Sequence, residues 1–537
     1  MKNYRHIYTL LLLFFTPLLI TSCLKDLDRF PQNDNTSIQV YSTFDGYKSA
    51  LAKIYAGYTL SGNQGPAGKP DVVGLDEGSN ADFLRCYFNH QVLPTDEAHC
   101  LWISDPGIPE LNSMNFTSDG KFTIGLYDKC ILQIMYANEF IKNTADNASG
   151  KGFTDDEIKE IKSFRAEARF LRAFDYWVLM DVFGNPPFIT ENDNFGILPK
   201  QIQRAELFTY IETELLDLVN GTDLKNARSN EYGRADKGAA NALLARLYLN
   251  AEVYTGKTKW TEAITYSKNA INSGYTLMDN YENLFLADND KNNNEVILSI
   301  NYDGKNTRLF GGTTFLINCC SNGEYQTTYK NKLIHYGIFS NANWAGYRAR
   351  KEFSDKFDSN DKRFLFVGEN KAIGAHPTEY PYGMATYKFR NIKTTSTVTT
   401  PVYGSDVEFA DNDFPLFRLA EMYLIYAEAV VRGGSGGSVT EALGYINQLR
   451  TRAKISSINS SQMTADFILD ERARELYWEC SRRTDLIRYG KFTSNNYIWE
   501  WKGGVQNGRS VDAHYNLYPI PSSDLMANPN LKQNDKY

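Results

Sequence analysis

The sequence predicts a mostly α-helical protein: a tetratricopeptide-like scaffold of helix pairs, with long irregular loops and a few short strands forming a ligand face. Two blocks, about 123–275 and 416–490, carry apolar residues at spacings of three and four, the period of a helix with one buried face. Short polar turns join the helices of the first block, which favours antiparallel pairs. Two other segments, about 60–122 and 285–415, lack this period and are expected to form the ligand-face loops.

Composition limits the classes of function. The chain has 537 residues, 42% of them hydrophobic, and a net charge of -7. It carries no basic block, which argues against nucleic-acid binding. Aromatic residues make up 14% of the chain. Aromatic rings fill cores, and they also build flat binding surfaces.

The N-terminus predicts export and lipid attachment. A basic start and the apolar run 9–20 fit a secretory signal that is too short to span a bilayer. The run ends in "ITSC", which resembles a bacterial lipobox and predicts that Cys23 is lipidated. The following "LKDLD" resembles the surface-export signal of Bacteroidetes lipoproteins. Residues 1–22 are therefore expected to be removed, with a flexible tether over 23–38 and a single helical domain over 39–537.

The helices of the first block follow in order. The pattern predicts helices over 157–184, 205–220, 236–256 and 260–274. The first should stop at Gly184, because two prolines follow at 186 and 187. Gly274 stands at an expected helix C-terminus.

The second block predicts helices over 417–434, 440–454 and 466–490. Between the blocks, the runs "EVILSI" (295–300) and "TSTVTTPVY" (395–403) are β-like. Trp102, Phe310 and Trp344 lie in the long loops, which favours a functional role for those loops.

One set of carboxylates invites a catalytic interpretation. Glu471, Glu475 and Glu479 repeat every fourth residue, and paired carboxylates are the machinery of glycoside hydrolysis. Arg474, Arg482 and Arg483 stand within three or four residues of them, so a structural ladder of ion pairs explains the pattern. No nucleophile, phosphate-binding or metalloprotease motif appears. We therefore predict a protein that is not an enzyme and has no catalytic cofactor.

Cysteines and acidic loops give weaker signals. The seven cysteines show no metal-site spacing, and pairing among Cys319, Cys320 and the others stays open. The loops "ADNDKNNNE" and "ADNDFP" offer the oxygen ligands that calcium prefers. Neither loop matches an EF-hand, so solvated loops are an equal interpretation.

Several long blocks resemble one family. They are "AEARFLRAFDYWVLMDVFGNPPF", "GRADKGAANALLARLYLNAEVYTG", "DFPLFRLAEMYLIYAEA", "ERARELYWECSRRTDLIRYGKF" and the C-terminal "YPIPSSDLMANPNLKQNDKY". Together they resemble the SusD/RagB family, in order and over nearly the whole chain. The resemblance implies a surface glycan-binding lipoprotein that works with a TonB-dependent (SusC-like) transporter at the outer membrane, on its extracellular side.

A loop over 74–102, "GLDEGSNADFLRCYFNHQVLPTDEAHCLW", is most similar to the starch-binding member of this family. The resemblance implies that an aromatic arc stacks on an α-1,4-glucan while polar groups bond its hydroxyls. The carbohydrate-binding residues that it implies are Arg85, Trp102, Asp105, Phe310 and Trp344. Cys100 departs from the pattern, because a tryptophan is expected there. Either Trp102 replaces that platform or the arc is shorter.

The resemblance also implies a structural calcium ion, which ties two loops together through Asp290, Asn292, Asp411 and Asp413. Three other functions stay open beside starch capture. They are capture of a different glycan or a peptide, a surface glycosidase, and a scaffold lipoprotein without a ligand.

Overall fold

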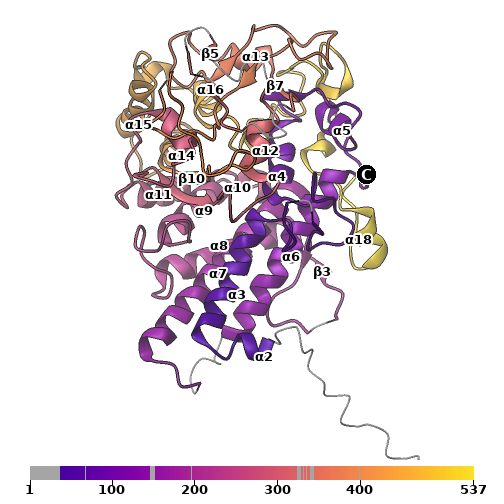
Figure 1. Ribbon diagram of the computed structural model, residues 1–537, viewed down its shortest axis with the longest axis vertical. Helices are drawn as coiled ribbons and strands as arrows, with labels where there is room; N and C mark the ends of the chain where they lie inside the picture. The colour runs from indigo at the N-terminus through magenta and orange to yellow at the C-terminus, as the bar shows by residue number, and fades with distance from the viewer. Residues whose placement is uncertain are drawn as a thin grey trace, which may run out of the picture.

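A row of packed helices forms the body of the protein (Figure 1). The computed structural model describes residues 37–66, 68–144, 151–194, 196–322, 328–329, 332–333, 335–338, 344–397 and 399–537. The helices of the row are α6 (Lys121–Thr144), α7 (Asp155–Phe183), α8 (Arg204–Asn220), α9 (Lys237–Leu249), α11 (Trp260–Ile271), α14 (Leu419–Val431), α15 (Val439–Arg452) and α16 (Ala465–Leu476). The mostly α-helical prediction is confirmed.

Other helices and five strand pairs complete the described part of the chain. The remaining helices are α2 (Ser37–Val40), α3 (Phe44–Thr59), α4 (Phe83–Val92), α5 (Ile108–Ser113), α10 (Ala251–Thr255), α12 (Gly312–Asn318), α13 (Lys351–Ser354), α17 (Arg482–Arg488) and α18 (Ser522–Ala527), with 3-10 turns η3 (Tyr281–Phe285), η5 (Ser460–Gln462), η6 (Lys502–Gly504) and η7 (Ala513–Asn516). The strand pairs, all antiparallel, are β1 (Ala98–Cys100) with β7 (Tyr347–Ala349), β2 (Pro187–Phe188) with β3 (Lys200–Gln201), β4 (Val296–Ile300) with β10 (Phe414–Arg418), β5 (Thr328–Tyr329) with β6 (Lys332–Leu333), and β8 (Phe366–Val367) with β9 (Ala385–Thr386).

Helix α7 shows how local sequence sets the boundaries. The Thr154 hydroxyl accepts a hydrogen bond from the backbone of Glu157, whose carboxylate returns the bond, so a capping box starts the helix. The helix ends at Gly184, whose φ of 77° lies in the region that favours glycine. Both ends match the sequence prediction within two residues.

The long insertion between α11 and α14 leaves the row of helices unbroken. Helix α11 packs on α14 although about 150 residues separate them. Strand β4 at the start of the insertion pairs with β10 at its end, and every residue of both strands is buried. This pairing holds the two ends of the insertion together. The predicted strand over 295–300 is confirmed.

The predicted helix over 466–490 is wrong as a single element. Helix α16 ends at Leu476 and α17 begins at Arg482. Between them Trp478 and Cys480 both have a φ of 61°, a left-handed conformation that costs about 1–2 kcal/mol in a residue other than glycine. The backbone N–H of Trp478 donates to the buried Glu97 carboxylate, and the Trp478 side chain is fully buried. Contacts with distant residues therefore override the helical period.

Three further expectations differ from the structure. The described residues of the run 395–403 form no strand, and an isolated bridge joins Ile392 to Tyr403, because Thr397 and Thr400 exchange backbone hydrogen bonds with each other (3.1 and 3.3 Å). The predicted loop over 60–122 contains α4, a helix whose ten residues are all buried. The helix predicted over 236–256 divides at Asn250 into α9 and α10.

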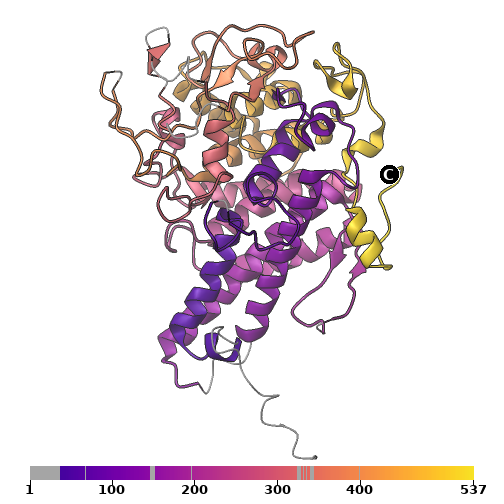
Figure 2. The same cartoon turned by 45° about the vertical axis from the view of Figure 1, so that its right-hand side comes forward.

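The C-terminal segment returns to the N-terminal half, where Figure 2 shows it running along one side of the molecule. The Tyr518 ring stacks on Phe116 with ring centroids 4.0 Å apart. The backbone N–H of Tyr518 donates to the carbonyl of Val182 at the end of α7 (2.9 Å). One hydrophobic cluster consequently includes residues from Tyr41 to Leu531.

Candidate functional site

Two tryptophans from distant parts of the sequence lie side by side. The ring centroids of Trp102 and Trp344 are 6.4 Å apart with an angle of 56° between the planes, and both side chains are half-buried. The indole N–H of Trp102 donates to the carbonyl of Trp344 (3.1 Å). Gly346 permits this approach, since a Cβ there would stand 2.2 Å from the Trp102 ring.

The pairing of strands β1 and β7 positions this tryptophan pair. Cys100 faces Tyr347 in the antiparallel register, so Trp102 follows one strand and Trp344 precedes the other. The Tyr347 ring meets Trp102 edge-on, with centroids 5.5 Å apart. Tyr347 is itself fully buried, so it supports the pair from below. No local pattern predicts this support, because it depends on strand pairing across about 250 residues.

Arg85 is linked to the tryptophan pair through a third aromatic ring. Its guanidinium stands 4.5 Å from the centroid of the Phe315 ring, and Phe315 contacts Trp344 with centroids 6.4 Å apart. Only 7% of Arg85 is exposed, and its Nε has no hydrogen-bond partner among the described residues. Arg85 is thus a nearly buried donor behind Phe315, and its Nη1 donates to the carbonyl of Gly78.

Asp105 lies in the turn that follows Trp102 and is exposed. Its backbone N–H donates to the carbonyl of Trp102 (3.0 Å), which fixes the turn. Trp102, Asp105 and Trp344 are therefore neighbours, and Arg85 is linked to them through Phe315. An exposed carboxylate can accept hydrogen bonds from hydroxyl groups.

Phe310 and Cys100 lie differently. The half-buried Phe310 ring contacts Phe409, with centroids 5.3 Å apart, and no ring contact with either tryptophan is found in the described part of the chain. Phe310 precedes α12, whose start is tied to α4 by the Asp82 carboxylate, which accepts from the N–H groups of Gly312 and Arg85. Cys100 is fully buried in β1. It offers no platform, which favours the alternative that Trp102 takes this role.

The four residues predicted to bind calcium do not form a clear metal site. The two loops do meet, because Asn289 and Asp413 exchange hydrogen bonds (2.8 and 3.0 Å). Burial, together with the nearby Asp290 and Asp411 carboxylates, raises the pKa of Asp413 to about 7. The Asp411 oxygens accept from the N–H groups of Gly304 and Ser405, and Asp413 accepts from Tyr302 and Tyr232. Among the described residues, no group of three His, Cys, Asp or Glu side chains could hold a metal ion.

Comparison with known families decides the classification. A model of the SusD family matches residues 261–537, and a second family model, described as starch-binding and associating with the outer membrane, matches residues 108–249. The chain is 36% identical over 561 residues to the starch-binding protein SusD of Bacteroides thetaiotaomicron, covering 96% of each chain. The chain belongs to the SusD family. The family prediction is thereby confirmed.

Solved structures resemble this SusD family member in fold. Surface glycan-binding protein A from Bacteroides uniformis matches with a TM-score of 0.70 at 20% identity, over 92% of this chain and 99% of that one. The same kind of protein from Bacteroides thetaiotaomicron, solved with laminarihexaose, matches with a TM-score of 0.66 at 20% identity, over 91% and 99%. No helix in the described part of the chain is long and apolar enough to cross a membrane.

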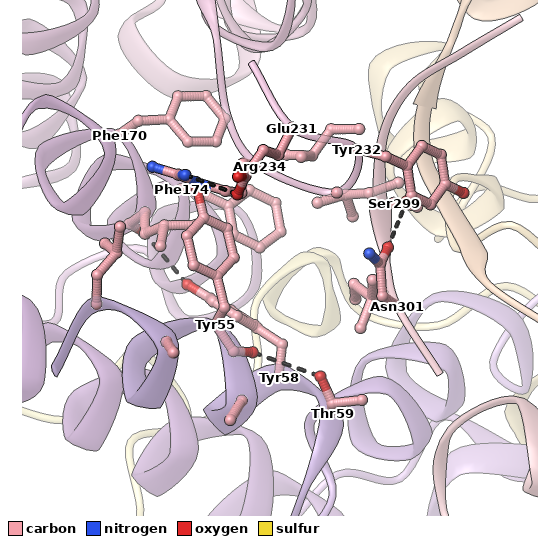
Figure 3. A pocket seen from close by; sticks show the side chains of 18 of the residues that line it. Tyr55, Tyr58, Thr59, Phe170, Phe174, Glu231, Tyr232, Arg234, Ser299 and Asn301 are labelled. Atoms are coloured by element: carbon pink, nitrogen blue, oxygen red, sulfur yellow. Dashed lines mark hydrogen bonds and ion pairs between the residues drawn. The ribbon is translucent and has the colours of Figure 1, made fainter. Parts of the chain in front are cut away.

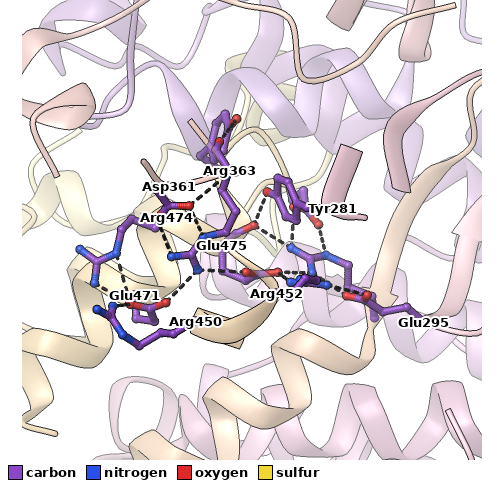
Figure 4. A network of polar contacts seen from close by, with 12 residues as sticks. Tyr281, Glu295, Asp361, Arg363, Arg450, Arg452, Glu471, Arg474 and Glu475 are labelled. Carbon is purple, nitrogen blue, oxygen red and sulfur yellow. Dashed lines mark hydrogen bonds and ion pairs between the residues drawn. The ribbon is translucent and has the colours of Figure 1, made fainter. Parts of the chain in front are cut away.

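The carboxylates that suggested catalysis belong to a buried network in this SusD family member (Figure 4). Glu471 and Glu475 are fully buried. Arg363 pairs with both, at 2.8 and 3.1 Å. Arg418 pairs with Glu475 (2.6 Å) and with Glu479 (2.6 Å), although Glu479 lies beyond the end of α16.

The structural role predicted for these glutamates is therefore confirmed with different partners. Arg474 pairs with Glu471 (2.7 Å) as expected. Arg482 pairs instead with Asp96 (2.7 Å), and Arg483 with Asp181 (3.3 Å). Most arginines of the network come from other elements, a property that helical spacing does not reveal. The six described cysteines are free and buried, with 3.6 Å between the sulfurs of Cys319 and Cys320.

Stability of this SusD family member is expected to peak at about pH 5. Burial alone would raise the pKa of Glu471, but Arg363 and Arg474 outweigh it and lower the pKa to about 2. The stabilisation that these arginines give to the ionised Glu471 is complete above the pKa that a glutamate has in the unfolded chain. It is lost as pH falls, which lowers the free energy of unfolding by about 3 kcal/mol by pH 2. Burial raises the pKa of Glu97 to about 8, so stability also falls as pH rises from 5 to 8.

Urea unfolding midpoints at pH 3, 5 and 8 measure this profile. Glu97→Gln should remove the loss on the alkaline side and leave the acid side unchanged. A midpoint that rises steadily from pH 3 to pH 8 in the unmodified protein contradicts the prediction.

A separate cavity of about 350 Å³ lies between α3, α7 and the β4–β10 pair. Figure 3 shows Tyr55, Phe174 and Tyr232 around it. Its polar groups are already paired, for example the Tyr55 hydroxyl with Glu167 (2.7 Å) and the Tyr232 hydroxyl with Asp413 (2.8 Å). None of the predicted site residues lines this cavity.

Proposed function

We propose that this protein is a cell-surface lipoprotein that captures starch and maltooligosaccharides, which are α-1,4-glucans, and delivers them to a partner TonB-dependent outer-membrane transporter. The tryptophan pair carries the proposal, with Asp105 in the turn after Trp102 and Arg85 behind Phe315, which contacts Trp344. Sugar rings stack on aromatic faces while a few polar groups fix their orientation. The relative that shares 36% identity over nearly the whole chain is named a starch-binding protein, which supports this ligand.

Capture requires no chemistry from the protein. The carboxylates that a glycosidase would need are buried and held by arginines, which supports a binding role. Lipid attachment at Cys23 lies outside the described residues and stays a prediction from the sequence. Release of a Cys23→Ala variant from the outer-membrane fraction would support it, and retention there would contradict it.

Starch binding is expected to slow the protein in a native gel that contains amylopectin. A gel without polysaccharide and a gel with laminarin serve as references. A protein specific for starch should migrate more slowly in the amylopectin gel only. Unchanged migration in amylopectin contradicts the starch assignment. Loss of retardation in EDTA and its return with calcium would support the calcium prediction.

A second candidate is capture of a different glycan. Cys100 is buried where an aromatic platform was expected, and Phe310 packs on Phe409 away from the tryptophan pair. A relative of the same fold is solved with laminarihexaose. Retardation in laminarin alone would favour this candidate.

A further inference from the structure

A large polar pocket lies between the segments 280–286, 359–365 and 387–397 and Lys454, and neither tryptophan of the pair lines it. Its volume of about 860 Å³ lies within the usual range of small-ligand pockets, about 300–1,000 Å³. None of Arg85, Trp102, Phe310 and Trp344 lines it. The lining includes four cationic residues and two aromatic residues: Lys362, Lys393, Lys454, Arg390, Phe364 and Tyr387.

Backbone contacts between distant segments build this pocket. The N–H of Arg390 donates to the carbonyl of Phe285 (3.2 Å), which joins the 387–397 segment to η3. The N–H of Lys362 donates to the carbonyl of Ala453 (2.9 Å), which sets Lys362 beside the end of α15. The pocket is consequently held by hydrogen bonds on two sides.

Positive charge in the pocket exceeds negative charge. Two carboxylates line it, and each is already paired: Glu282 with Arg390 (2.6 Å) and Asp361 with Arg363 (2.7 Å). The ammonium groups of Lys362, Lys393 and Lys454 form no ion pair or hydrogen bond with the described residues. The nearby Asp288 carboxylate is held by the hydroxyl of Thr394 (2.7 Å). A pocket with three unpaired cations in a chain of net charge -7 attracts anions locally.

Lys454 adds an independent observation. It follows the last turn of α15 with a φ of 59°, at a position where glycine is the usual residue. Holding a lysine in this conformation costs about 1 kcal/mol. A strained residue whose charge faces a pocket is a candidate for function.

The pocket also offers apolar surface. The half-buried Phe364 ring supplies it, whereas Tyr387 is 3% exposed and lies under the Arg390 guanidinium, 5.3 Å from its ring centroid. A ring beside hydroxyl and amide side chains suits a sugar, which presents both apolar faces and hydroxyl groups. Inorganic anions would use the lysines only.

We propose that this pocket is a second ligand site, which binds an acidic saccharide, a sugar carrying carboxylate or sulfate groups. The lysines recognise the charge and the ring surface recognises the sugar. The site is independent of the tryptophan pair and of starch as the ligand of that pair.

Isothermal titration of the full chain tests the proposal, with a galacturonate oligosaccharide, a sulfated disaccharide, maltoheptaose and inorganic sulfate as probes. We expect one acidic sugar to bind more tightly than maltoheptaose and sulfate, with an affinity that falls as salt rises. The double variant Lys362→Gln/Lys393→Gln should weaken this binding up to about tenfold. The control Lys159→Gln, an exposed lysine on α7, should leave it unchanged.

Lys454→Gly is the most informative variant, because it removes the charge of the lysine and also the backbone strain at this position. It should weaken the acidic sugar while leaving the melting temperature equal or higher. Equal affinity for inorganic sulfate and for the acidic sugars overturns the saccharide assignment. Loss of acidic-sugar binding in Trp344→Ala overturns the second site. Acidic-sugar binding without amylopectin retardation contradicts the proposed starch function and leaves this inference standing.

Discussion

Replacing Arg418 with methionine is expected to lower the free energy of unfolding by about 3–5 kcal/mol. Arg418 is 1% exposed and pairs with three carboxylates, those of Glu295 (2.9 Å), Glu475 (2.6 Å) and Glu479 (2.6 Å). It also donates to the backbone carbonyl of Glu475 (2.7 Å), one of the last carbonyls of α16. Methionine fills much of the space but leaves these buried charges and this helix end without their partner.

Urea unfolding at pH 7 measures the effect. The matched control is Arg509→Met, an exposed arginine without an ion pair in the described structure, and its effect should stay within about 0.5 kcal/mol. A loss below 1 kcal/mol in Arg418→Met would show that Arg363, Arg452 and Lys388, which pair with Glu475, Glu295 and Glu479, neutralise these carboxylates without Arg418.

Trp344→Ala is expected to abolish retardation of the protein in amylopectin. The two tilted rings are the proposed stacking surface for the glucan, and truncating one aromatic anchor of a binding site costs about 2 kcal/mol or more, which exceeds tenfold in affinity. Trp344 is half-buried, so part of its ring contacts Phe315 and part is open to a ligand.

A matched variant separates binding from stability. Trp260→Ala removes another half-buried tryptophan, at the start of α11 and outside the proposed site. It should leave the retardation intact even if its melting temperature falls as far as that of Trp344→Ala. Full retardation of Trp344→Ala in amylopectin would show that the glucan binds at a site other than the tryptophan pair.

Local sequence predicts much of the scaffold and little of its interruptions. The ends of α7 follow from a capping box, a glycine and two prolines, all within a few residues of the boundary. The break after Leu476 has no such signal. It depends on Glu97 and Arg418, which meet residues 475–478 only in the folded chain.

For the candidate site too, the sequence indicates some features and only the folded chain shows the others. Resemblance to the family indicates Arg85, Trp102, Asp105 and Trp344, and the structure brings these together. It cannot show that Cys100 is buried opposite Tyr347, since this register arises from pairing β1 with β7. The lysines of the polar pocket carry no sequence pattern either. They lie in three segments that meet only in the folded chain, through backbone hydrogen bonds and side-chain contacts.

The stacking of Tyr518 on Phe116 has a consequence for the order of folding. The ring that covers Phe116 and the N–H that reaches Val182 both belong to Tyr518, about 400 residues after Phe116 in the chain. Closing a loop of about 400 residues is slow compared with forming neighbouring helix pairs. The N-terminal half of the core therefore stays incomplete until the segment around Tyr518 has folded back onto it, so the helix pairs are expected to form before the core is sealed.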